Sequence, residues 1–328
     1  MVRARGRHLK VLTGRAHPAL AKEVAKHLGV PLGKVDLGNF ANGEISCKLG
    51  DSVRGEDVFI VQSHSAVMGA GSVNDALMEQ LLMIDAAKRA SARSITAVCP
   101  FLGYARQDRK ASGREPITAR LIVDLIAASG ADRIISIDLH SGQTQGFFSG
   151  PFDHLIAAPT LLKYIQKNFG KDLVIVSPDA GRVKMSERYA SELKTDMAII
   201  HKHRSATKKN SVEAKYLIGE VKGRNCLIMD DMIDTAGTIC AAADLLAKNG
   251  AKKIYGAATH GVLSDPALKR IQDSAFTKVV VTNTLPLVAG KKDSKIATVT
   301  IAPLIADAIN AIFAYSSVSA IFGGKNQF

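Results

Sequence analysis

Short β-rich segments alternate with longer helical segments along this chain, and the alternation constrains the fold more than any other feature. Apolar, β-branched runs at 57–61, 94–98 and 133–137 are separated by stretches with helical periodicity at 73–90 and 117–129. Parallel strands need a long crossover connection, which is usually a helix. The pattern therefore predicts an α/β protein with a mainly parallel sheet.

The same alternation starts again after Pro151. Its segments are helix-like at 158–168, 182–193 and 239–248 and strand-like at 173–176, 197–200, 226–229 and 253–259. A chain of 328 residues is long enough for two domains of ordinary size. We therefore predict similar α/β domains at 8–155 and 156–305, followed by a C-terminal helix and tail at 306–328. Gly29, Gly130 and Gly250 stand where left-handed residues are expected to end helices.

The charge of the chain favours an anionic partner. Its 43 Lys and Arg exceed its 30 Asp and Glu, giving a formal net charge of +13, which suits nucleic acid, a membrane surface or phosphorylated small molecules. Without Trp, and without a basic tract interleaved with aromatic residues, nucleic acid is not expected. No apolar run approaches the roughly 20 residues of a membrane span. Charge alone does not choose among these partners, and we expect neither a nucleic acid nor a membrane partner.

The N-terminus and the cysteines predict an intracellular location. The basic start runs directly into a strand-like segment, without the apolar stretch of a signal peptide. The four cysteines lie far apart and form no CxxC pair. We expect buried thiols in a reducing compartment and a cytoplasmic protein.

The segment 225–238 carries the most chemical information. It reads as a strand, an acidic turn with Asp230, Asp231 and Asp234, and then the start of a helix. The free N–H groups and positive dipole of a helix start hold phosphate. Acids beside such a cradle suit sugar hydroxyls or a metal, and a ribose phosphate satisfies both halves. The alternative is an ordinary helix capped by Asp234 or Thr235.

Four segments then resemble known proteins. Segment 230–238 resembles the phosphoribosyl-diphosphate motif of type I phosphoribosyltransferases and ribose-phosphate diphosphokinases, while 103–110, 138–148 and 176–181 resemble the diphosphokinases alone, in their phosphate-activated bacterial-type class. The resemblance implies two tandem type I phosphoribosyltransferase-like (Rossmann-like) domains. It also implies conversion of ATP and ribose 5-phosphate to AMP and 5-phosphoribosyl diphosphate, which serves purine, pyrimidine, NAD, His and Trp biosynthesis.

The resemblance assigns roles to individual residues. For ATP it implies Phe40, Asn42, Gly43, Glu44, Arg106, Gln107, Asp108 and His140. For ribose 5-phosphate it implies Arg204, Asp230, Asp231, Asp234, Thr235, Ala236, Gly237 and Thr238. Lys202 and Arg204 are implied as catalytic, Arg109 and Lys110 as part of a flexible loop, and His140 and Asp179 as residues around Mg²⁺. It further implies a homo-oligomer, commonly a hexamer, activated by inorganic phosphate and inhibited by ADP.

Physical chemistry supports most of these roles. We expect Arg106 to end a strand at the carboxyl edge of the sheet, where its planar guanidinium suits a phosphate or an adenine face. Mg²⁺ prefers oxygen, so His140 is better suited to a metal-bound water or a phosphate. Without the resemblance, Lys202 and Arg204 read equally well as a solvated charge cluster.

One position departs from the family pattern. The family usually has Phe-x-Asp-Gly-Glu where this chain has Asn42, in a loop that in the family reaches ATP from a neighbouring subunit. The amide oxygen still accepts a hydrogen bond, so we expect weakened rather than abolished use of ATP.

Two other functions stay open. One is a non-catalytic regulatory homologue, which retained Lys202 and Arg204 argue against, and the other is a type I phosphoribosyltransferase. The chain contains no GxxxxGK[ST] segment, which excludes a P-loop kinase.

Overall fold

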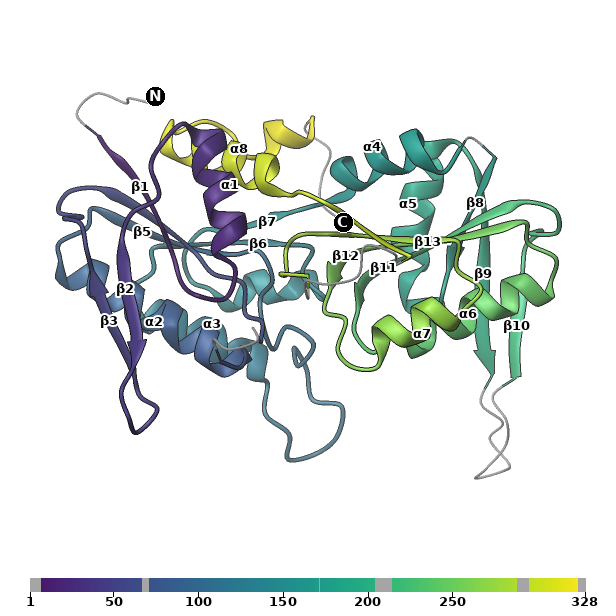
Figure 1. The fold of residues 1–328 in the computed structure, drawn as a ribbon, viewed down its shortest axis with the longest axis horizontal. Helices are drawn as coiled ribbons and strands as arrows, with labels where there is room; N and C mark the ends of the chain where they lie inside the picture. Colours follow the sequence, from purple (N-terminus) through teal and green to yellow (C-terminus); the bar gives the residue numbers. More distant parts are fainter. Residues whose placement is uncertain (1–6, 67–70, 171, 204–213, 288–294, 324–328) are drawn as a thin grey trace. The chain divides into compact units, whose positions relative to one another are not determined.

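The computed structural model describes residues 7–66, 71–170, 172–203, 214–287 and 295–323. The chain forms two compact units (Figure 1), the first made of Met1–Ala157, Thr284–Pro286 and Thr300–Phe328 and the second of Ala158–Asn283 and Leu287–Val299. The domain limits 8–155, 156–305 and 306–328 stay predictions. The contacts of the structure group residues 300–328 with the first unit, because helix α8 (Ala302–Phe313) packs on α1 (Pro18–Leu28).

The first unit contains a five-stranded parallel sheet in the order β1-β4-β5-β6-β7. The strands are β1 (Leu9–Thr13), β4 (Asp57–Val61), β5 (Ser94–Cys99), β6 (Arg133–Ile137) and β7 (Phe152–Leu155). Helices α2 (Val73–Arg89) and α3 (Thr118–Ser129) lie on one face, and α1 and α8 on the other (Figure 1). A separate antiparallel hairpin joins β2 (Val35–Asn39) and β3 (Ile45–Leu49), and the short 3-10 segments η1 (Gly142–Phe147) and η3 (Ser319–Phe322) complete the unit.

The second unit contains a seven-stranded sheet in the order β10-β9-β8-β11-β12-β13-β14. Its strands are β8 (Leu173–Ser177), β9 (Asp196–His203), β10 (Ala214–Ile218), β11 (Asn225–Ile233), β12 (Lys253–Gly261), β13 (Lys278–Thr282) and β14 (Ile296–Val299). Only β10 is antiparallel among these described strands. Helices α4 (Ala158–Asn168) and α5 (Val183–Leu193) lie on one face, and α6 (Gly237–Lys248) and α7 (Ala267–Asp273) on the other (Figure 1).

The predicted α/β class with mainly parallel sheets is confirmed. Every residue of β4 and of β8 is buried, as expected for strands whose sheet carries helices on both faces. Each unit has its own apolar cluster, built around residues such as Ile60 and Met83 in the first and Ile228 and Leu246 in the second. The apolar runs in the sequence therefore correctly indicate strands that are buried on both faces of the sheet.

Local predictions agree with the structure in most places. Gly29, Gly130 and Gly250 have φ of 68°, 116° and 81°, and all three follow helices as predicted. Of the four cysteines, three are buried and Cys47 is only partly buried. None of the helices in the described part of the chain is long and apolar enough to cross a membrane.

The strand order of the second sheet reverses between β8 and β11. From β8 the chain crosses through α5 to β9 on one side, and from β11 it crosses through α6 to β12 on the other. Diverging crossovers leave a crevice outside the carboxyl ends of the two central strands, which is where open α/β sheets bind ligands. We therefore expect a ligand site at the carboxyl edge of the second sheet, between β8 and β11.

Candidate functional site

The loop between β11 and α6 in the second unit, with the first residue of α6 (residues 234–237), is named the anion cradle after its predicted role. The N-cap residue of α6 is Ala236, whose side chain supplies no capping group. The prediction of a helix capped at its N-cap by Asp234 or Thr235 is therefore wrong. Ala236 has φ 60° and ψ 6°, a left-handed conformation that costs a non-glycine residue about 1 kcal/mol. Such strain concentrates at binding loops.

Two neighbouring acids precede this loop, inside the strand rather than in a turn. Asp230 pairs in register with Ala258 of β12, so the predicted acidic turn begins later than expected, at Asp234. The Asp231 side chain is buried, and the main-chain N–H of Met232 donates to it at 2.9 Å. The strand pairing extends because a partner strand of nine residues is available, which local sequence does not reveal.

Arg182 joins the two acids. Its Nε lies 3.0 Å from Oδ1 of Asp230 and its Nη2 lies 2.6 Å from Oδ1 of Asp231. Burial and the neighbouring Asp231 together raise the pKa of Asp230 to about 8, against the opposing charge of Arg182. The pair therefore carries less than its full negative charge at neutral pH, which lowers its repulsion of a nearby phosphate.

Asp179 holds Arg182 in place. It follows β8, and its Oδ1 accepts from the N–H of Gly181 at 2.9 Å, which caps the 3-10 turn η2 (Ala180–Arg182). Since β8 pairs with β11, the turn brings Arg182 beside the acids. Sequence analysis missed Arg182, although it stands three residues after a predicted site residue.

The residues predicted around Mg²⁺ belong to different units, Asp179 to the second and His140 to the first. The ligand chemistry of each residue shows whether it suits Mg²⁺. Among the described residues no three His, Cys, Asp or Glu side chains group together as a metal site. Mg²⁺ is commonly held by one or two carboxylates together with substrate phosphates and water. Asp179 has one oxygen engaged in the cap, and its second oxygen fits that kind of site.

A second arginine touches the anion cradle. Nη1 of Arg270, on α7, donates to the main-chain oxygen of Thr235 at 2.9 Å. A methyl group added at Gly237 would lie 3.5 Å from the same Nη1. The guanidinium therefore stands directly beside the loop, and its other N–H groups suit an anion there. No spacing in the sequence pointed to this residue.

The predicted ATP residues Arg106 to Asp108 lie in the loop between β5 and α3. Arg106 and Gln107 are exposed and Asp108 is partly buried. The prediction that Arg106 ends a strand is wrong, because β5 ends at Cys99. The loop still leaves the carboxyl edge of the sheet, and Oγ1 of Thr118 donates to Oε1 of Gln107 at 2.7 Å.

The hairpin loop with Asn42 is exposed and ordered by its own hydrogen bonds. Oδ1 of Asn42 accepts from the N–H of Glu44 at 3.2 Å, and Gly43 has φ 91°. The N–H of Phe40 donates to the main-chain oxygen of Glu44 at 2.8 Å, while the Phe40 side chain is 59% exposed. The amide oxygen thus makes the turn bond that a carboxylate oxygen would make.

His140 follows β6, which is the neighbour of β5 in the sheet. The preceding residue is anchored by a buried histidine, because the N–H of Leu139 donates to Nε2 of His154 at 2.9 Å. Parallel neighbours end at one edge, so the loops with Arg106 and with His140 leave the first sheet at the same edge. The structure therefore brings two of the three predicted ATP segments together within this unit.

The remaining predicted residues are described less fully. Lys202 lies in β9, opposite Lys215 of β10, at the same carboxyl edge as Asp179. Its side chain lies outside the described part of the structure, as does all of Arg204. Arg109 and Lys110 are exposed in the loop before α3.

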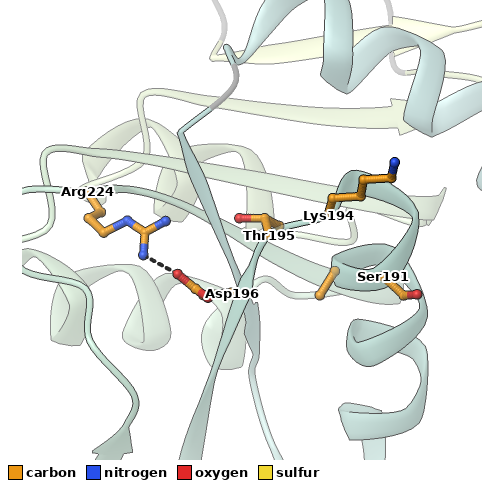
Figure 2. A pocket seen from close by; sticks show the side chains of 6 residues that line it. Ser191, Lys194, Thr195, Asp196 and Arg224 are labelled. Atoms are coloured by element: carbon orange, nitrogen blue, oxygen red, sulfur yellow. Dashed lines mark hydrogen bonds and ion pairs between the residues drawn. The ribbon is translucent and has the colours of Figure 1, made fainter.

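A surface pocket of about 380 Å³ opens at the opposite edge of the second sheet (Figure 2). It is lined by Ala190, Ser191, Lys194, Thr195, Asp196 and Arg224. Asp196 begins β9 and Arg224 precedes β11, so this pocket faces the amino ends of the strands. Nη1 of Arg224 lies 2.6 Å from Oδ2 of Asp196, an ion pair drawn in Figure 2. None of the predicted site residues lines it.

Comparison with known proteins agrees with the fold. Residues 9–130 match the family model for the N-terminal domain of ribose phosphate pyrophosphokinase, and 209–323 match the phosphoribosyl synthetase-associated domain. A ribose-phosphate pyrophosphokinase of Streptomyces coelicolor is 51% identical over 311 residues, covering 94% of each chain. One from Caldanaerobacter subterraneus is 50% identical over 315 residues, covering 96% of this chain and 98% of its own.

A solved structure gives the same answer. The phosphoribosylpyrophosphate synthetase of Mycobacterium smegmatis superposes with a TM-score of 0.88 at 48% identity, covering 94% of this chain and all of that one. Two α/β units and a strand–acid pair–helix loop define a protein with two type I phosphoribosyltransferase-like domains. Within that class, this chain belongs to the ribose-phosphate pyrophosphokinase family and is an enzyme of that family.

Proposed function

We propose that this enzyme transfers a diphosphate from ATP to ribose 5-phosphate, which gives AMP and 5-phosphoribosyl diphosphate. The observation that carries the proposal is the β11–α6 loop, where an arginine-bound acid pair precedes a helix start whose N-cap side chain supplies no cap. Asp230 and Asp231 suit the ribose hydroxyls, and Thr235, Gly237 and Thr238 suit the 5-phosphate. Asp234 and Ala236 complete the proposed ribose 5-phosphate loop.

In the proposed reaction the C1 hydroxyl of the ribose attacks the β-phosphorus of ATP. A bond forms between that oxygen and the β-phosphorus, the bond from the β-phosphorus to the α,β-bridging oxygen breaks, AMP leaves and the hydroxyl proton is released. Such transfers depend on positioning and on neutralising charge. Lys202 and Arg204 are proposed for the developing charge, with Arg109 and Lys110 in a loop that closes over ATP.

ATP binding is proposed for residues of the first unit. The planar guanidinium of Arg106 suits a phosphate or the adenine face, and Gln107 and Asp108 continue the same loop. His140 suits a metal-bound water or a phosphate oxygen rather than the metal itself. Phe40, Asn42, Gly43 and Glu44 form an exposed hairpin loop, and we propose that it reaches ATP of a neighbouring subunit.

Mg²⁺ is proposed as the cofactor, with Asp179 as a carboxylate that would hold it. When bound, Mg²⁺ neutralises phosphate charge on the transferred group. We further propose a cytoplasmic homo-oligomer, a hexamer in its family's usual form, that inorganic phosphate activates and ADP inhibits. Its product would supply purine, pyrimidine, NAD, His and Trp biosynthesis.

The test is product formation from defined substrates. Purified protein with ATP, Mg²⁺, phosphate and ribose 5-phosphate is expected to form AMP and 5-phosphoribosyl diphosphate in equal amounts, measured by chromatography. Lys202→Ala is expected to remove both products. No AMP from the parent protein would support the regulatory homologue. Ribosylation of an added base from supplied 5-phosphoribosyl diphosphate would support a phosphoribosyltransferase.

A further inference from the structure

A chain of buried hydrogen bonds links strand β4 to the loop between β5 and α3. Nε2 of Gln80 donates to the main-chain oxygen of Ile60 at 3.2 Å. Oε1 of Gln80 lies 2.7 Å from Nε2 of His64, and Nδ1 of His64 accepts from the N–H of Gly103 at 3.0 Å. These three bonds form one continuous path from the sheet to the loop.

The path has only one consistent polarity. A main-chain oxygen only accepts, so the NH₂ group of Gln80 faces Ile60 and the Gln80 oxygen faces the imidazole. That oxygen also only accepts, so Nε2 of His64 carries the proton and Nδ1 is the acceptor. Sγ of Cys99 lies 3.2 Å from the same Gln80 oxygen and agrees with this assignment.

Burial keeps the imidazole neutral. His64 is 1% exposed and Gln80 is 0% exposed. Burial lowers the pKa of His64 to about 4, against a smaller opposing effect of the Gln80 hydrogen bond. At neutral pH the ring therefore keeps one proton, and Nδ1 keeps its lone pair for Gly103.

His64 touches the loop at two points. Its main-chain N–H donates to the oxygen of Phe101 at 3.1 Å, in addition to the side-chain bond with Gly103. A methyl group added at Gly103 would lie 2.9 Å from Cβ of His64, closer than real Cβ atoms come. Directly after Gly103 the chain turns, with the N–H of Gln107 donating to the oxygen of Tyr104 at 2.9 Å.

We propose that His64 is a positioning residue for ATP: its Nδ1 fixes the Gly103 amide, and through it the turn that presents Arg106 and Gln107. The proposal rests on the proposed function, in which those two residues contact ATP. Both ring nitrogens of His64 already have protein partners, so it acts through the loop and not on the nucleotide.

Two substitutions separate the two ring nitrogens. His64→Asn keeps an oxygen acceptor near the position of Nδ1 and has no atom at the position of Nε2. His64→Gln extends its amide toward Gln80 and leaves the Gly103 N–H without an acceptor. Both remove the ring from the core, so they serve as matched variants for the loss of packing.

The experiment measures KM for ATP and for ribose 5-phosphate, together with amide hydrogen exchange in segment 101–107. His64→Gln is expected to raise KM for ATP about 5- to 10-fold, the size of one lost hydrogen bond, and to speed exchange at Gly103. His64→Asn is expected to change both less, and KM for ribose 5-phosphate is expected to stay the same in each. Equal effects of the two variants, or a rise in both KM values, would overturn the proposal.

A third variant and a binding assay make the test independent of the folding of His64→Gln and of turnover. Gln80→Leu leaves His64 in place but no longer fixes its tautomer, so it is expected to raise KM for ATP less than His64→Gln does. It replaces His64→Gln in the test if that variant does not fold. Calorimetry with a non-hydrolysable ATP analogue compares the same variants without turnover. A parent protein that releases no AMP contradicts the proposed function, whereas unchanged exchange and analogue affinity in His64→Gln contradict the positioning role alone.

Discussion

The two units present their candidate residues by different physical means. In the second unit the residues lie at the carboxyl edge of the sheet, where the strand order reverses between β8 and β11, and a charged group, Arg182, holds the acid pair. In the first unit the strands follow one another in one direction, and the buried histidines His64 and His154 accept hydrogen bonds from main-chain N–H groups of the loops with Arg106 and His140.

This difference matches the proposed ligands. A small, doubly charged sugar phosphate is held at close range by ionic groups whose charge depends on pH. A larger nucleotide depends on the placement of exposed side chains, and neutral anchors place them with little dependence on pH or salt. The two halves should therefore respond differently to substitution.

The largest expected effect comes from Arg182→Met. It leaves Asp230 and Asp231 without their cation, so the free energy of unfolding falls by up to about 3 kcal/mol and KM for ribose 5-phosphate rises more than about tenfold. Lys269→Met removes an exposed ion pair of the same unit, whose side chains are 80% and 60% exposed, and is expected to cost about 0.3–0.5 kcal/mol. Denaturant unfolding compares them, and equal losses would show that Arg182 is no more than a surface pair.

Gly103→Ala tests the close packing of the first unit. The added methyl group would meet Cβ of His64 at 2.9 Å, and such overpacking costs about 1–3 kcal/mol. Steady-state kinetics are expected to show a several-fold rise in KM for ATP. In Gly146→Ala, in the 3-10 segment η1 of the same unit, the added methyl group meets no atom within 4 Å, so this control should behave like the parent. An equal rise in KM for ATP in the control would contradict the claim that the contact with His64 causes the effect of Gly103→Ala.

The pH dependence of stability should separate the two units. The folded pKa of Asp230 is raised to about 8 from an ordinary 3.8, so between these values the folded state binds more protons than the unfolded state. Asp230 therefore lowers the free energy of unfolding as pH rises through this window, by at most about 1.4 kcal/mol per pH unit. The lowered pKa of His64, about 4 against an ordinary 6.5, acts in the opposite direction below pH 6.5. Asp230→Asn is therefore expected to flatten the falling slope in urea unfolding at pH 6.5 to 8, where His64 no longer contributes. An unchanged slope would contradict the raised pKa.

The smallest expected effect is that of Thr118→Val. It removes the 2.7 Å hydrogen bond to Gln107, a bond at an exposed position, so KM for ATP is expected to rise about twofold. Thr118→Ser keeps the hydroxyl and should retain the parent value. If KM for ATP rises as much in Thr118→Ser as in Thr118→Val, the hydroxyl is not what holds Gln107.

The sequence was sufficient for elements whose signals are local. The strands at 57–61 and 133–137 match β4 and β6, and the helix at 158–168 matches α4, because burial on both faces and helical periodicity are written into neighbouring residues. The motif at 225–238 predicts the anion cradle in the same way. The roles of the remaining segments, including the exposed hairpin loop, come from resemblance to a family and stay predictions.

The sequence did not predict features that depend on contacts between residues far apart in the chain. Strand β11 continues through Asp230 and Asp231 because β12 is there to pair with Asp230, Met232 and Ile233. Local composition favoured a turn. Arg182, Arg270 and His64 became visible only through contacts with residues far along the chain. The grouping of 300–328 with the first unit likewise depends on packing of α8 against α1.

The most direct test of the division between the two units is a four-value kinetic measurement: KM for ATP and KM for ribose 5-phosphate in Arg182→Met and in His64→Gln. The account predicts that Arg182→Met raises KM for ribose 5-phosphate and that His64→Gln raises KM for ATP, each leaving the other constant close to the parent. If either variant raises both constants together, the two ligands do not depend on separate units and the account is wrong.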